Sequence, residues 1–120
     1  MKKFVLDSTA WSAGMHKVGD FRVAPADLVR AFGSPPLHGD AYKTSGEYRF
    51  VSDAGEVFAL YDWKETSQYR EEEDYAPSPE EFWRLANLVN FSIGGAGSPD
   101  DLVIWLQAAL AVDTIYKEKG

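Results

Sequence analysis

The chain of 120 residues contains no cysteine, which excludes disulfide bonds and thiolate metal sites. Histidine is also scarce, because only His16 and His38 occur, and both lie in connections rich in glycine or proline. A metal site needs at least three converging ligands, so we expect no metal site and no cofactor.

Long apolar runs are absent as well. Asp7 interrupts the apolar stretch that follows the basic N-terminus, which argues against a signal peptide. Gln107 and Asp113 divide the longest apolar stretch, which is too short to span a bilayer. We therefore predict a soluble, cytoplasmic protein that does not enter a membrane.

Positive charge is in deficit, since 12 Lys and Arg face 19 Asp and Glu and the net charge is −7. Ten carboxylates lie between Asp53 and Glu81, where the only bases are Lys64 and Arg70, so this segment carries −8. A nucleic-acid binder needs the opposite sign, so we expect no direct contact with nucleic acid. A protein with a basic surface would be attracted. The alternative is a solvated face that keeps the protein in solution.

What the chain does contain is globular composition, with 45% apolar and 14% aromatic residues, enough for one core and a single domain over residues 1–120. Alternating residues predict strands over 47–52 and 56–64, joined by a turn at 53–55. Shorter β-like stretches occur at 3–11, 21–23 and 88–93, and residues 14–19 resemble a turn.

Three helix starts carry proline and acids in the first turn. They predict helices over 24–33, from residue 78 onward, and from residue 98 onward. The last has a long apolar stripe that includes Leu102, Trp105, Leu106, Ala109, Val112 and Tyr116. We therefore predict an α+β fold in which a small antiparallel sheet of three or four strands packs against two or three helices, with a long C-terminal helix over the sheet.

The sequence offers no clear catalytic residues. Ser92 is not in the elbow motif of a serine hydrolase. The glycines at 94–97 resemble a phosphate loop, but Asp100 and Asp101 follow them where such a loop has lysine. A binding protein is therefore favoured over an enzyme.

A candidate binding surface combines acids and aromatics. Phe82 and Trp83 are adjacent on a helix and cannot both face inward, so one of them is partly exposed. Exposed aromatics beside charged groups are typical of binding hot spots. The predicted partner-binding residues are Asp62, Glu65, Tyr69, Glu71, Glu72, Glu73, Asp74, Tyr75 and Trp83.

The stretch GEVFALYDWK at 55–64, followed by FSIGG at 91–95, resembles small proteins encoded by phages and mobile elements. In those proteins a YDWK-type strand end precedes a W-x-I-G-G segment, and Phe91 stands here in place of the Trp. The resemblance covers about residues 28–110 and carries over no catalytic residues. It implies an accessory protein acting inside a bacterial cell, in a setting that includes anti-CRISPR proteins and other counter-defence inhibitors.

These observations predict an inhibitor that occupies the basic surface of a partner, such as a nucleic-acid-handling defence complex. Two alternatives stay open. One is an immunity or antitoxin-type partner of a basic toxin, which uses the same electrostatics. The other is a small enzyme, which requires a concave pocket with converging polar groups and a strongly shifted carboxylate.

Overall fold

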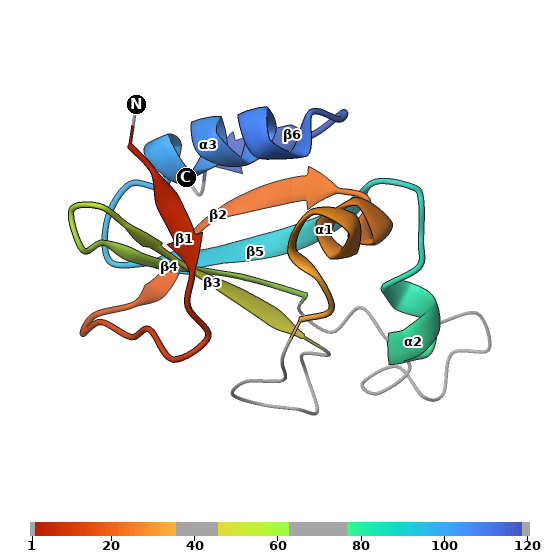
Figure 1. Ribbon diagram of the computed structural model, residues 1–120, viewed down its shortest axis with the longest axis horizontal. Helices are drawn as coiled ribbons and strands as arrows, with labels where there is room; N and C mark the ends of the chain where they lie inside the picture. Colours follow the sequence, from red (N-terminus) through yellow and green to blue (C-terminus); the bar gives the residue numbers. More distant parts are fainter. Residues whose placement is uncertain (1, 36–45, 63–76, 119–120) are drawn as a thin grey trace.

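The computed structural model describes residues 2–35, 46–62 and 77–118. Within them the chain forms six strands and three helices (Figure 1). The strands form one sheet in the order β1-β3-β4-β5-β2-β6, and every neighbouring pair is antiparallel. In chain order the elements are β1 (Phe4–Leu6), β2 (His16–Val23), α1 (Pro25–Phe32), β3 (Glu47–Ser52), β4 (Val57–Tyr61), α2 (Pro79–Phe82), β5 (Val89–Gly95), α3 (Asp100–Leu110) and β6 (Ile115–Glu118).

The predicted sheet of three or four strands is wrong, because six strands dominate the fold and the helices are short. Part of the difference lies in β2, which begins at His16 inside the stretch predicted as a turn. A β-bulge between Lys17 and Gly19 accommodates the irregular pairing there. The predicted opening strand over 3–11 is also shorter, because β1 ends at Leu6.

The predicted long C-terminal helix is wrong as well. The helix α3 ends at Leu110, because Ala111 takes a left-handed conformation with φ 53° and ψ 37°. The chain then continues as β6, where β-branched Ile115 suits a strand and Tyr116 lies opposite Phe21 of β2. Tyr116 therefore belongs to the sheet and not to a helical stripe.

Other predictions are confirmed. The strands β3 and β4 pair as the predicted hairpin, with Glu47 opposite Tyr61 and Val51 opposite Val57. The helix α1 lies within the predicted range and has proline at its first position. The predicted helix after residue 78 exists but is only four residues long.

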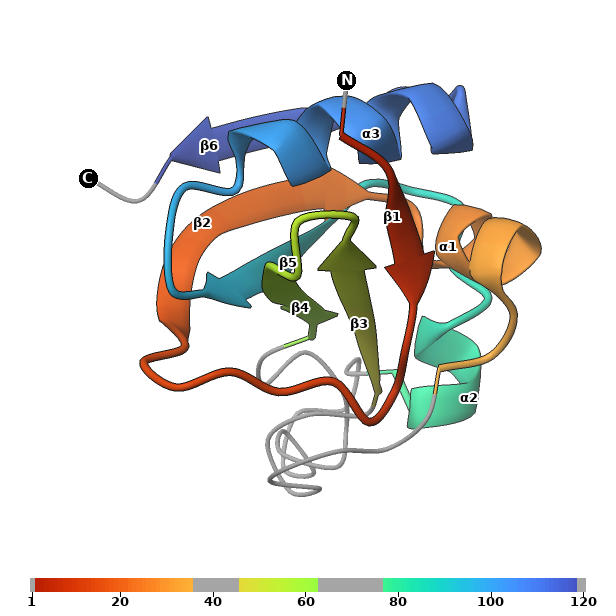
Figure 2. The ribbon, with the colours of Figure 1, turned by 60° about the vertical axis from the view of Figure 1, so that its left-hand side comes forward.

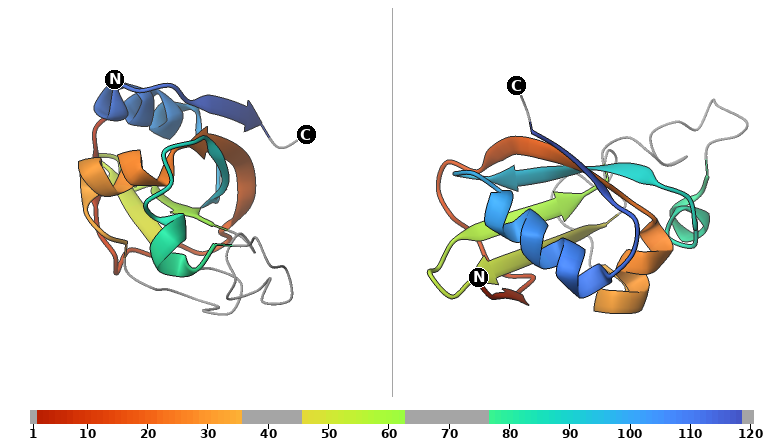
Figure 3. Two further views of the ribbon diagram at one scale, coloured as in Figure 1. Left: turned by 90° about the vertical axis from the view of Figure 1, so that its right-hand side faces the viewer. Right: turned by 90° about the horizontal axis from the view of Figure 1, so that it is seen from above.

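The sheet is strongly curled, and α3 crosses its open side (Figures 2 and 3). Both edges of the sheet contact the first turn of α3. Lys2, just before β1, lies 3.2 Å from Asp101, measured from Nζ to Oδ2. The hydroxyl of Tyr116 in β6 lies 3.5 Å from Oδ1 of Asp100. The helix α3 thus spans the gap between the two edge strands.

The core fills the concave side of this sheet. The strands contribute fully buried side chains such as Phe21, Phe50 and Phe91, while α1 and α3 contribute Leu28 and Leu106. Burying side chains of this size stabilises the fold by about 1.5–3 kcal/mol each.

The connection from β1 to β2 crosses the outer face of the sheet, because β1 is an edge strand and β2 is the fifth in order. Arg49 projects from β3 on the face opposite Phe50, and its Nη1 donates to the carbonyl oxygen of Ala10 at 2.6 Å. Its Nε also contacts the carboxylate of Glu47 at 2.8 Å. Figure 2 shows this connection running from β1 to β2. Arg49 therefore ties it to the outer face of the sheet.

Candidate partner-binding surface

Most of the predicted partner-binding residues lie outside the described residues: Glu65, Tyr69, Glu71, Glu72, Glu73, Asp74 and Tyr75. Two of the predicted residues, Asp62 and Trp83, fall within the described part of the chain. The structure gives these two different environments.

Asp62 is fully buried, which corrects its prediction as a surface group. It follows β4 directly, and its Oδ1 accepts a hydrogen bond from the backbone N–H of Gly46 at 3.1 Å. Gly46 itself lies just before β3, the hairpin partner of β4. Since buried carboxylates require such donors, Asp62 joins the open ends of the hairpin.

The remaining described carboxylates between residues 53 and 81 lie at two separate places. Asp53 and Glu56 lie at the β3–β4 turn, and Glu80 and Glu81 lie on α2, at the other end of the molecule (Figure 1). Glu56 is paired with Lys2, at a side-chain exposure of 42%. Of the described acids in this segment, those on α2 are therefore the ones beside Trp83.

The helix α2 is short, and its capping fixes where Trp83 stands. The hydroxyl of Ser78 accepts a hydrogen bond from the N–H of Glu81 at 3.2 Å, and the Glu81 carboxylate accepts one from the N–H of Ser78 at 3.3 Å. This reciprocal capping box satisfies two backbone donors at the helix start. Trp83 is the residue that ends the helix.

As predicted, one of the two neighbours is partly exposed: Phe82 is only 1% exposed, whereas Trp83 is partly exposed. The Trp83 ring packs against Phe82, Phe91 and Tyr48 at centroid separations of 5.1, 5.6 and 5.9 Å. A β-carbon on Gly46 would stand 2.9 Å from Cζ2 of Trp83, so glycine there permits the close approach of the ring.

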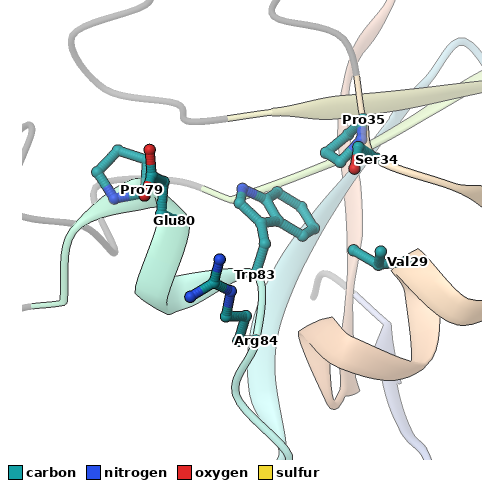
Figure 4. A pocket seen from close by; sticks show the side chains of 7 residues that line it. All are labelled: Val29, Ser34, Pro35, Pro79, Glu80, Trp83 and Arg84. Atoms are coloured by element: carbon teal, nitrogen blue, oxygen red, sulfur yellow. The ribbon is translucent and has the colours of Figure 1, made fainter.

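An open cleft of about 340 Å³ lies beside Trp83, between α1 and α2. In Figure 4 the indole stands at its centre, with Pro79 and Glu80 on one side and Val29 and Pro35 on the other. The lining residues are Val29, Ser34, Pro35, Pro79, Glu80, Trp83 and Arg84. The cleft therefore combines apolar walls with charged groups at its rim, and its volume is in the range of sites that take one large side chain or a small molecule.

Sequence reasoning missed a polar cluster on the outer face of the sheet. Asp20 accepts hydrogen bonds from Asn90 at 3.0 Å and from Lys17 at 2.8 Å. Partial burial opposes ionisation of Asp20, but the bonds from Asn90 and Lys17 outweigh it and hold the pKa of Asp20 below its usual value. Burial raises the pKa of the nearby Tyr61 hydroxyl, and the carboxylates of Glu47 and Asp20 add to this rise. The cluster joins strands that are far apart in sequence, and no sequence motif marks it.

A second missed feature is Trp11, which lies on the connection across the outer face and is 71% exposed.

Among the described residues no group of three metal-ligating side chains comes together, and no helix there has the length and apolarity to cross a bilayer. Comparison with models of known protein families finds no match, and no curated protein matches the chain.

Proposed function

We propose that the protein is an acidic binding protein that occupies a basic surface of a partner, with the Trp83 cleft at the apolar centre of the contact. The observation that supports this proposal is that Trp83, a partly exposed aromatic, lies beside the exposed Glu80 and Glu81 of α2, which outnumber the one base that lines the cleft, Arg84. Tryptophan is enriched among residues that dominate binding energy, and rim charges mainly set association rate and specificity.

In the proposed binding mechanism, Trp83 provides the apolar contact and the neighbouring acids attract the partner. Trp83 is held by Phe82, Phe91 and Tyr48, so a partner side chain entering the cleft meets a surface that is already ordered. The segment from Asp53 to Glu81 carries −8, and its acids on α2 would steer and orient a cationic partner.

The partner we propose is a nucleic-acid-handling defence complex, and the protein is then a phage-encoded, anti-CRISPR-like inhibitor that acts in the bacterial cytoplasm. Two lines support this proposal: the resemblance of residues 55–64 and 91–95 to small phage proteins, and the net charge of −7. Carboxylates in a row compete with phosphates for a surface that binds a charged backbone.

The binding proposal is tested by capture on immobilised protein from a bacterial lysate, with elution by a salt gradient and mass spectrometry of the eluate. The proposal expects a basic protein that elutes between about 0.2 and 0.5 M salt, because screening weakens contacts between exposed charges. Capture of acidic or neutral proteins only, or capture that does not respond to salt, contradicts it.

Matched variants locate the contact. The variant E71Q/E72Q/E73Q removes three charges from the acidic segment 53–81, and D100N/D113N/E118Q removes three from exposed positions outside that segment. Loss of capture with the first variant and not with the second supports the proposed surface. Equal loss with both variants means that net charge alone governs the interaction. Capture of a toxin enzyme in place of a nucleic-acid-handling complex overturns the proposed partner.

A further inference from the structure

The strand β1 is one edge of the sheet, and its backbone is arranged for a further strand. Among the described residues it pairs only with β3. The carbonyl of Lys3 accepts from the N–H of Asp53 at 3.1 Å, and the N–H of Asp7 donates to the carbonyl of Arg49 at 3.0 Å. Because an antiparallel ladder alternates, the N–H and C=O groups of the intervening Phe4 and Leu6 point away from β3.

The side chains of β1 are apolar at the centre and charged at both ends. Val5 and Leu6 are 64% and 44% exposed, so two neighbouring apolar side chains reach the surface at this edge. Lys3 precedes them and Asp7 follows them, and both are exposed. The two ends of this segment therefore carry opposite charges.

We propose that a second copy of this chain pairs antiparallel with β1, centred on Val5. In this register Lys3 lies opposite the partner's Asp7, and Phe4 lies opposite the partner's Leu6. The two-fold axis passes between Val5 and the partner's Val5, so each contact occurs twice, as in an isologous interface.

Backbone and side chains favour the same register. Phe4 and Leu6 are the residues whose backbone groups point outward, and this register makes them the pair that exchanges both hydrogen bonds. Val5 meets its counterpart on the outer face, where apolar pairs directly opposite each other are stabilising. Lys3 and Asp7 form cross-strand pairs of opposite charge on that same face.

The Asp7 carboxylate is already oriented and ionised. Its Oδ1 accepts hydrogen bonds from the hydroxyl and the N–H of Thr9, at 2.7 and 3.0 Å. These bonds hold the pKa of Asp7 below its usual value. Asp7 therefore carries its charge at neutral pH, as the pairing with the partner's Lys3 requires.

The opposite edge of the sheet lacks this complementarity. The strand β6 runs from Ile115 to Glu118, and pairing two copies about Tyr116 would place Ile115 opposite Lys117 of the other copy. Among the residues of the strand itself, 115–118, no pair of opposite charges results. Self-association is therefore assigned to β1, where the flanking charges and the outward-pointing backbone groups favour one register.

The contact is short, since β1 has three residues, and the interface is smaller than the roughly 1,200–2,000 Å² of stable complexes. We expect a dimer with a dissociation constant on the order of 100 µM, weakened by salt. Sedimentation velocity of the whole chain, from about 10 µM to about 1 mM, measures this association.

Charge reversal tests the register. In the variant K3D the strand carries acids at both ends, and in D7K it carries lysines at both ends, so each variant alone places like charges opposite each other. We expect each variant alone to remain monomeric at 1 mM, roughly tenfold above the expected dissociation constant. An equimolar mixture should form a heterodimer, because the register then brings every acid opposite a lysine. Circular dichroism of each variant verifies that the fold is retained.

Three results overturn the proposal. One is a wild-type chain that stays monomeric at 1 mM. Another is dimerisation of K3D or D7K alone to the wild-type extent, which would place the contact on another face. The last is a mixture of the two folded variants that remains monomeric, which would contradict the register even if the wild type dimerises.

Discussion

Gly95 lies directly against the ring of Phe58, so that a β-carbon at residue 95 would stand 2.5 Å from Cδ1 of Phe58. The two residues are opposite each other in the β4–β5 ladder, at the centre of the sheet. The close approach is possible because Gly95 has no side chain. The glycine is therefore a packing requirement of the sheet, and the GG pair at 94–95 extends β5 beyond the predicted β-like stretch 88–93.

We predict that G95A destabilises the protein by about 1–3 kcal/mol, because the added methyl group forces the Phe58 ring from its position. The matched control is G97A, since a β-carbon at Gly97 would meet no atom within 4 Å. Urea denaturation followed by circular dichroism measures the free energy of unfolding of each variant. Equal stability of G95A and the wild type would contradict the packing described.

The hydroxyl of Tyr48 donates to the carbonyl of Gly33 at 2.6 Å and joins β3 to the end of α1. We predict that Y48F destabilises the protein by about 0.5–1.5 kcal/mol, because the carbonyl loses its donor. Thermal unfolding at pH 7 measures this difference. A variant that is as stable as the wild type would mean that water replaces the hydroxyl without loss.

Burial also raises the pKa of Tyr48 well above its ordinary value near 10. A tyrosine is neutral when protonated, so the unfolded chain loses this proton at a lower pH than the folded one. The contribution of the protonated Tyr48 to the free energy of unfolding is therefore fully present below about pH 10 and is lost as the pH rises beyond that value. We predict that the stability of Y48F falls less between pH 9 and 11 than that of the wild type, as measured by urea denaturation. Parallel curves for the two proteins would contradict the burial of this hydroxyl.

The capping box of α2 predicts a further effect. S78A removes the acceptor for the N–H of Glu81 and should cost about 1 kcal/mol of stability, whereas S78D keeps an acceptor and should restore most of it. Since α2 positions Trp83, S78A should also weaken capture of a partner more than S78D does. Identical behaviour of the two variants would show that the cap does not hold the cleft.

The hairpin of β3 and β4 and the helix α1 were predictable because their signals are local. Alternation marks the strands, and proline at the first helical position with glycine after the last marks α1. The strand β6 was not predictable in this way, because Tyr116 fits both a helical stripe and a strand. The assignment of Tyr116 to a strand depends on Phe21, which lies opposite Tyr116 in the sheet and is distant from it in the sequence.

In the candidate site, too, features with a local signal were predictable and features that depend on distant residues were not. Partial exposure of one of the neighbours Phe82 and Trp83 follows from their adjacency, and the structure confirms it and shows that Trp83 is the exposed one. Burial of Asp62 depends on the N–H of Gly46, which only the folded hairpin brings near. A carboxylate at a strand end resembles a surface group in the sequence unless that distant donor is known.

A competition measurement tests the proposal that the protein occupies a basic nucleic-acid-binding surface. Purified CRISPR effector complexes of several types, each loaded with guide RNA, are titrated with the protein while binding of a fluorescent target DNA is followed by anisotropy. We expect one of these complexes to lose DNA binding at about one equivalent of protein, and E71Q/E72Q/E73Q to be at least about tenfold weaker while D100N/D113N/E118Q is not. DNA binding that stays unchanged in every complex, or inhibition that is the same for both variants, contradicts it.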